Sequence, residues 1–171
     1  MGSDGERVAA SLADWLAALA FVDQPEDAVT ALIVDAVADW ATGQGWRVYR
    51  RAPSVATLRP PYAHQHSYLD VGCARPDGSP IAVEVDRTDR RRTVDKLLAE
   101  AAAGRVAVWV RWGSRRFDPP PPPVTMVTCE VTSRPAVAGK GRLYSRPPAG
   151  SRPAPMHPDT GVAPGEQADL F

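Results

Sequence analysis

The chain has 171 residues, of which 44 % are hydrophobic, as expected for one globular domain with a sizeable core. No apolar run is long enough to cross a bilayer and the first residues are acidic rather than basic, so we expect a cytoplasmic protein with neither a signal peptide nor a membrane partner. The formal net charge is zero, yet residues 47–116 hold fourteen basic and seven acidic residues, an excess that would attract DNA.

The first part of the chain predicts two helices and a strand. Apolar residues recur at helical spacing over residues 5–21 and again over residues 26–41. The second of these helices begins with a proline and two acids, which favour a helix start. Residues 46–50 then predict a strand. We treat residues 1–22 as an N-terminal amphipathic helix that precedes the main domain.

Two predicted strands, residues 67–73 and 81–86, carry acids between apolar residues. Because side chains alternate along a strand, Asp70 points away from the apolar face of the first strand, and Glu84 and Asp86 share one face of the second. Paired as a hairpin, the strands would bring three carboxylates together. Such a cluster repels itself unless a cation such as Mg²⁺ (or Mn²⁺) neutralises it. The alternative is a strand whose acids face solvent.

The second part of the chain predicts a helix, two strands and a tail. The helix ends at Gly104, and residues 106–110 form an apolar strand typical of a sheet covered on both faces. Five prolines at 119–123 predict a stiff polyproline II spacer before a last strand at 124–131. Pro, Gly, Ser, Ala and Arg dominate afterwards, which predicts a disordered linker over residues 132–165.

The remaining metal-ligand side chains carry weaker signals. Cys73 and Cys129 lie in strand-like runs without metal-ligand spacing, which predicts two buried thiols in a reducing compartment. His64 and His66 have no third ligand nearby in the sequence, so a metal site there is a minor alternative.

The order helix, strand, acidic strand, Glu-x-Asp strand, helix, apolar strand over residues 26–112 resembles the core of the PD-(D/E)XK nuclease superfamily. In that family an Asp ends the second core strand, and a Glu or Asp two residues before a Lys lies on the third. Asp70 and Glu84 match the two acidic positions. Leu69 stands in place of the motif's Pro, and Asp86 in place of its Lys.

The resemblance implies an α/β, restriction-endonuclease-like fold with an αβββαβ core over residues 23–131. Its mixed central sheet would be flanked by helices, with the N-terminal helix before it and the disordered tail after it. The resemblance also implies metal-assisted phosphodiester hydrolysis, in which Asp70 and Glu84 ligate Mg²⁺ and Asp86 serves as a further ligand or as the general base.

Some members of the family take the missing Lys from the following helix, for which Lys96 is the candidate. At about 100° per residue, Lys96 lies roughly 150° from the centre of the helix's apolar stripe, so an ion pair with Glu100 at i+4 is the alternative. Members also often add an acid from the first core helix. Glu26 and Asp35 are the options here, although a solvated helix face would explain both.

Four arginines next to the acidic strands would hold phosphates bidentately. The alternative is that they only solvate the surface. They are Arg87, Arg90, Arg91 and Arg92.

Residues 166–171, Glu-Gln-Ala-Asp-Leu-Phe, resemble the short motif by which bacterial polymerases and repair proteins bind the replicative sliding clamp. Leu170 and Phe171 would fill an apolar pocket of the clamp, and Gln167 would make polar contacts. The alternative is an incidental hydrophobic segment, or one that folds back on the domain.

Together these features predict a nucleoid-associated, metal-dependent DNA nuclease that is tethered to the sliding clamp and acts in replication or repair. The first alternative, favoured by the missing motif Lys, is a non-catalytic nuclease-fold protein that binds DNA or acts as a clamp adaptor. The second is a toxin or defence endonuclease whose clamp motif is accidental.

Overall fold

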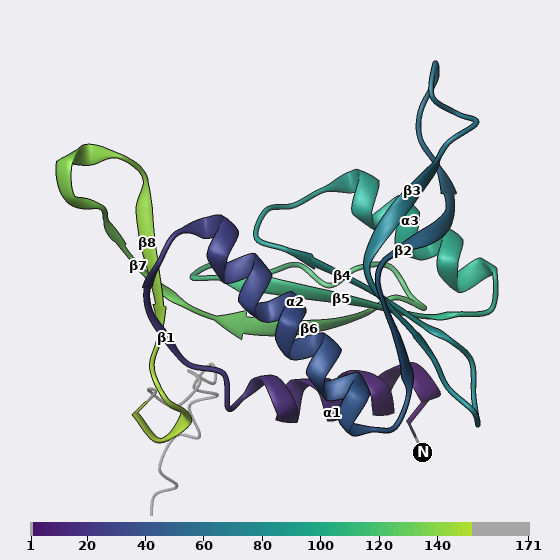
Figure 1. The fold of residues 1–171 in the computed structure, drawn as a ribbon, viewed down its shortest axis with the longest axis horizontal. Helices are drawn as coiled ribbons and strands as arrows, with labels where there is room; N and C mark the ends of the chain where they lie inside the picture. The colour runs from purple at the N-terminus through teal and green to yellow at the C-terminus, as the bar shows by residue number, and fades with distance from the viewer. Residues whose placement is uncertain (1, 152–171) are drawn as a thin grey trace, which may run out of the picture.

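Three helices cover the two faces of a five-stranded sheet in the computed structural model, which describes residues 2–151 (Figure 1). The helices are α1 (Asp4–Leu16), α2 (Glu26–Gly43) and α3 (Arg91–Ala102). The first two pack on one face and share a core with Val83 and Val108 of the sheet. On the opposite face, Leu97 of α3 packs against Trp109. The sheet is therefore the middle of three layers.

The central sheet is mixed. Its strands, in spatial order, are β2 (Arg47–Thr57), β3 (His66–Ala74), β4 (Ile81–Asp86), β5 (Val106–Gly113) and β6 (Thr125–Glu130). The pairs β2–β3 and β3–β4 are antiparallel, whereas β4–β5 and β5–β6 are parallel. All six residues of β4 are buried, because this strand is central and both of its faces are covered.

The predicted α/β class is confirmed, with a mixed central sheet flanked by helices. The predicted order of elements is also present, as α2, β2, β3, β4, α3 and β5. The alternation predicted for the acidic strands is confirmed too: Val71, Val83 and Val85 lie in the core beneath α1 and α2. The prolines at 119–123 lie in the loop that joins β5 to the parallel strand β6, within one sheet.

The strand predicted at 46–50 is longer than expected. β2 extends to Thr57 and forms a hairpin with β3 that projects beyond the rest of the sheet (Figure 1). Pro53 interrupts the apparent strand pattern in the sequence, but β2 is an edge strand, where the missing N–H of a proline is tolerated.

The first helix is shorter than predicted. It ends at Leu16, and Phe21–Gln24 forms strand β1 instead of continuing a helix to residue 21. The guanidinium of Arg146 donates hydrogen bonds to the carbonyl oxygens of Leu16 (3.2 Å) and Leu19 (2.9 Å). These bonds fix the chain where it leaves the helix, and their donor lies far away in the sequence.

The disorder predicted from Thr132 is wrong for residues 132–151. These residues include β7 (Thr132–Pro135) and β8 (Arg142–Arg146), which join β1 in a second, antiparallel sheet of order β1-β8-β7. Tyr144 of β8 is buried edge-to-face against Trp112, with ring centroids 5.0 Å apart. The composition of the segment is typical of a linker. It forms strands because β8 pairs with β1, which lies near the other end of the chain. The rest of the predicted linker lies outside the described residues.

Both cysteines are buried, as predicted for structural thiols, and no disulfide joins them. Burial raises the pKa of the Cys73 thiol to about 11, which disfavours its reactive thiolate form. Among the described residues, no helix combines the length and the apolar character that a membrane span needs.

Candidate active site

Asp70 and Glu84 lie on neighbouring strands, on the sheet face that α3 covers. The antiparallel register pairs Val71 with Val83, which sets Asp70 beside Glu84. The Val85 N–H donates to Asp70 Oδ2 at 2.8 Å and fixes that carboxylate against the neighbouring strand. The structure thus brings together the two acids that the nuclease resemblance singled out.

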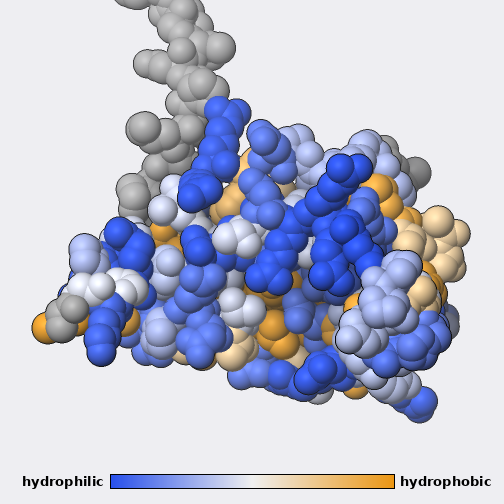
Figure 2. Space-filling model, turned by 90° about the horizontal axis from the view of Figure 1, so that it is seen from above, coloured by the Kyte–Doolittle hydropathy of each residue, from blue (hydrophilic) through white to orange (hydrophobic). Residues whose placement is uncertain are grey.

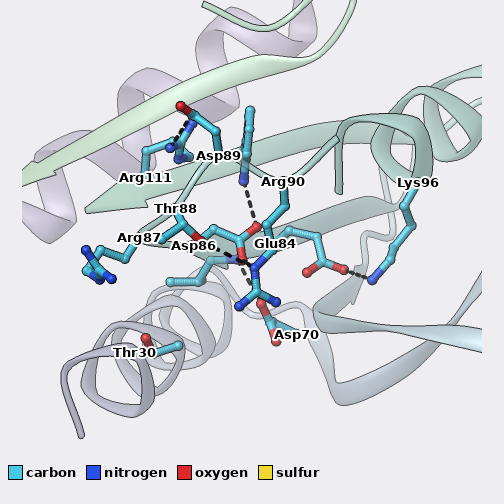
Figure 3. Close-up of polar contacts among 12 residues, drawn as sticks. Thr30, Asp70, Glu84, Asp86, Arg87, Thr88, Asp89, Arg90, Lys96 and Arg111 are labelled. Atoms are coloured by element: carbon cyan, nitrogen blue, oxygen red, sulfur yellow. Dashed lines mark hydrogen bonds and ion pairs between the residues drawn. The ribbon is translucent and has the colours of Figure 1, made fainter. Parts of the chain in front are cut away.

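Lys96 reaches the same point from α3. Its ammonium donates to Glu84 Oε1 at 2.5 Å (Figure 3). It also donates to the Tyr68 carbonyl oxygen at 2.7 Å. The alternative pairing with Glu100 does not form, because Glu100 accepts hydrogen bonds from Ser54 Oγ (2.6 Å) and from the Val55 N–H (2.8 Å). The candidate site therefore holds two carboxyl groups and one amine.

The expected helical angle for Lys96 was misleading because the most deeply buried face of α3 is not its most apolar one, although the apolar stripe is partly buried against the same cluster. Its buried residues are Thr93, Leu97 and Glu100. At about 100° per residue, Lys96 is about 70° from the centre of this face. Two of the three buried residues are polar, so hydropathy alone selects the wrong face.

The pKa of Glu84 is raised to about 8, first by burial and then by the negative charge of Asp70, although Lys96 acts in the opposite direction. Burial also raises the pKa of Asp70, against the lowering effect of the Val85 hydrogen bond. Two buried acids that resist ionisation together are a common feature of functional sites. A cation next to them would favour the charged forms of both.

Asp86 does not complete a three-carboxylate cluster. Its Oδ2 accepts a hydrogen bond from Trp109 Nε1 at 3.0 Å, and its Oδ1 lies 3.6 Å from Arg90 Nε (Figure 3). The parallel strand β5 places Trp109 next to this end of β4, and the buried indole N–H needs an acceptor. Within residues 2–151, no group of three or more His, Cys, Asp or Glu side chains is placed to hold a metal ion.

An open groove of about 1270 Å³ surrounds the site. It is bordered by the start of α2, the β2–β3 hairpin and the start of α3. The four arginines predicted to hold phosphates all line it; they are Arg87, Arg90, Arg91 and Arg92. Figure 2 shows the molecule from above, relative to Figure 1, and the surface seen there is mostly hydrophilic.

The other predicted side chains have different positions. Glu26 of α2 lines the groove and lies 3.0 Å from Arg87 Nε, whereas Asp35 forms an ion pair with Arg50. His64 and His66 line the groove, and Nδ1 of His66 contacts the Ser54 carbonyl oxygen at 3.0 Å.

A buried cation, which the sequence patterns did not indicate, lies next to the site. The Arg111 side chain is only 1 % exposed and lies between the rings of Trp109 (4.2 Å) and Phe117 (4.5 Å). It donates to Asp89 Oδ1 at 2.7 Å. The available signal was a charged residue between two tryptophans in a strand that is otherwise apolar.

The motif at Gln167, Leu170 and Phe171 lies outside the described residues. No protein-family model matches this chain, and neither a curated protein nor a solved structure matches it.

Proposed function

We propose that this protein is a metal-dependent phosphodiesterase of the PD-(D/E)XK type that cleaves DNA. The observation that carries the proposal is the meeting of Asp70, Glu84 and Lys96 at one point of a groove rich in arginine. A carboxylate pair with an amine suits phosphodiester hydrolysis, because the reaction needs a ligand set for a hard cation and a donor to water or phosphate.

The donor set fits Mg²⁺ or Mn²⁺. Mg²⁺ in phosphoryl-transfer sites is commonly held by one or two carboxylates, with water and substrate phosphate completing its shell. Asp70 and Glu84 would supply those carboxylates, and a full protein cage is not required. Bound there, the cation would lower the pKa of a coordinated water and neutralise charge on the phosphate.

The protein's own residues orient and hold the reactants. Lys96 anchors the Glu84 carboxyl and is itself held by the Tyr68 carbonyl oxygen, so its ammonium stays at the sheet face. Asp86 stays a candidate for the further ligand or the general base, because it lines the groove and one of its oxygens is engaged only by a contact of 3.6 Å to Arg90. The groove arginines would hold phosphates on either side of the scissile bond.

The competing function is non-catalytic DNA binding or clamp adaptation. One observation favours it: Lys96 already donates to Glu84 Oε1 at 2.5 Å, and this contact competes with a metal for that oxygen. Metal binding distinguishes the two proposals, because a binding module does not need a cation at Asp70 and Glu84.

The decisive experiment measures Mn²⁺ binding by calorimetry and Mg²⁺-dependent cleavage of DNA. We expect Asp70→Asn and Glu84→Gln to abolish both, and Lys96→Met to reduce cleavage by about 10²-fold or more. Lys140→Met is the matched control, because Lys140 is an exposed lysine away from the groove. Wild-type protein that neither binds Mn²⁺ nor cleaves DNA would contradict the nuclease and favour the adaptor.

We further propose that residues 166–171 dock on the sliding clamp. This proposal rests on the sequence resemblance of Gln167, Leu170 and Phe171 alone. Loss of clamp binding in Phe171→Ala, measured on the full chain, is the expected result. Unchanged binding would mean that the motif is accidental.

A further inference from the structure

A second, smaller pocket of about 200 Å³ opens where β5 ends and faces the β7–β8 hairpin. The end of β5 supplies Ser114 and Arg115, and the hairpin supplies Ser133, Arg142 and Tyr144. These segments are far apart in the sequence, so the pocket exists only through the second sheet. Arg87, which also lines the large groove, forms part of its wall.

The polar side chains of this pocket are hydrogen-bond donors, and three of them are guanidinium groups. No carboxylate belongs to the lining, as far as the described residues show. Arginine presents its N–H groups in a planar fork that matches phosphate bidentately, and serine and tyrosine hydroxyls add single donors. The chemistry of the pocket therefore selects an anion, and phosphate in particular.

Two of the three guanidinium groups, those of Arg115 and Arg142, are not engaged by a carboxylate, whereas Arg87 is paired with Glu26 at 3.0 Å. Arg142 directs both Nε and Nη2 to a single hydroxyl, Ser133 Oγ, at 3.1 and 3.0 Å. The Arg115 guanidinium has neither a hydrogen bond nor an ion pair within residues 2–151. A phosphate could thus bind without displacing a carboxylate from either residue.

A buried positive charge lies directly behind the pocket. Phe117, another lining residue, stacks on the guanidinium of Arg111. Nε and Nη1 of Arg111 are buried without a hydrogen-bond partner among the described residues, and its only acidic partner, Asp89, is 81 % exposed. Because a solvated carboxylate neutralises a buried cation poorly, this arrangement adds positive potential on the pocket side.

Size limits the ligand further. Pockets for drug-sized molecules measure roughly 300–1,000 Å³, so a pocket of about 200 Å³ suits a phosphate group better than a whole nucleotide. Arg87 borders both cavities, so the small pocket lies next to the groove that holds Asp70 and Glu84.

We propose that the pocket formed by Arg87, Arg115 and Arg142 binds a backbone phosphate of the nucleic-acid strand that occupies the groove. The identity of the strand rests on the proposed function, whereas the phosphate chemistry does not. Free inorganic phosphate or pyrophosphate shares this chemistry and is the other possible source.

The first test titrates inorganic pyrophosphate into the metal-free full chain by calorimetry. Arg115→Gln and Arg142→Gln should each weaken binding about tenfold or more, because each removes a charged, bidentate donor. Arg116→Gln is the matched control, because Arg116 is the adjacent exposed arginine and does not line the pocket. The affinity of this variant for pyrophosphate should stay within about twofold of wild type. Equal affinities for the Arg115 and Arg116 variants would overturn the site.

The second test measures the affinity of the same variants for a short oligonucleotide at several salt concentrations. Each pocket variant should weaken binding and reduce the slope of log affinity against log salt by about one, as expected for one lost phosphate contact. Weaker pyrophosphate binding with unchanged oligonucleotide binding would overturn the nucleic-acid assignment in favour of a free anion.

Both tests use metal-free protein and do not measure cleavage, so they are independent of the nuclease proposal. A chain that binds no Mn²⁺ but binds pyrophosphate through Arg115 and Arg142 would therefore contradict the nuclease and leave the phosphate pocket standing.

Discussion

At the scale of single residues, the ionisation of Glu84 is the most sensitive property of the site. Burial and the neighbouring Asp70 raise its pKa from an ordinary value of 4.5 to about 8. The folded chain therefore keeps a proton at neutral pH that the unfolded chain releases. This proton links the stability of the fold to the chemistry of the groove.

We expect the free energy of unfolding to fall as pH rises from about 4.5 to about 8, because in this range the folded state binds more protons than the unfolded state. Below this range Glu84 is protonated in both states and has no effect. The contribution of Glu84 to the slope is at most about 1.4 kcal/mol per pH unit. Glu84→Gln should remove it, which urea denaturation at several pH values would measure.

Glu130→Gln is the control for this measurement, since Glu130 is exposed on β6. It should keep the pH dependence of wild type. If Glu84→Gln had the same slope as wild type, Glu84 would not carry the retained proton.

At the scale of elements, Glu100 joins helix α3 to the edge strand β2. Its carboxylate is fully buried and accepts from Ser54 Oγ, the Val55 N–H and Arg105 Nη1. These bonds hold the helix that carries Lys96 and the hairpin strand that borders the groove. Glu100 therefore has a structural role, although it is a buried acid like those of the candidate site.

Glu100→Ala should destabilise the fold by about 3 kcal/mol, because it leaves buried donors on β2 without an acceptor. Chemical denaturation measures this loss. Ser54→Ala, which removes one of the donors, should cost only about 1 kcal/mol. A loss below about 1 kcal/mol for Glu100→Ala would show that β2 and α3 are held together by apolar packing alone.

At the scale of the whole molecule, residues 132–151 connect the two ends of the described chain. The Arg146 side chain is almost fully buried and donates to carbonyl oxygens of Leu16, Leu19 and Glu130. One guanidinium thus joins the end of α1, the start of β1 and the end of β6. The second sheet is an integral part of the domain and also forms one wall of the phosphate pocket.

Arg146→Met in the full chain should lower stability by about 2–4 kcal/mol, because it removes three hydrogen bonds that a buried guanidinium donates. Thermal denaturation would measure the effect. Arg134→Gln is the control: Arg134 forms an exposed ion pair with Asp23 at 2.8 Å, and its loss should hardly change the midpoint. Equal midpoints for the two variants would contradict an integral role for β8.

The sequence by itself determined α2, α3, the strands of the central sheet and the acidic pair, but not β1, β7 or β8. Periodicity and turn residues identify α2, α3 and the strands, and alternation along β3 and β4 places Asp70 and Glu84 on one face. These features depend on neighbours a few residues apart, which a linear pattern records.

Only the tertiary structure decided which side chains meet. Lys96 reaches Glu84 because α3 buries two polar residues, and Asp86 binds Trp109 because β5 lies parallel to β4. Residues 132–151 have the composition of a linker, and they form strands because β1 is available to pair with β8. Each of these outcomes depends on a contact between distant segments, and composition and periodicity carry no information about such contacts.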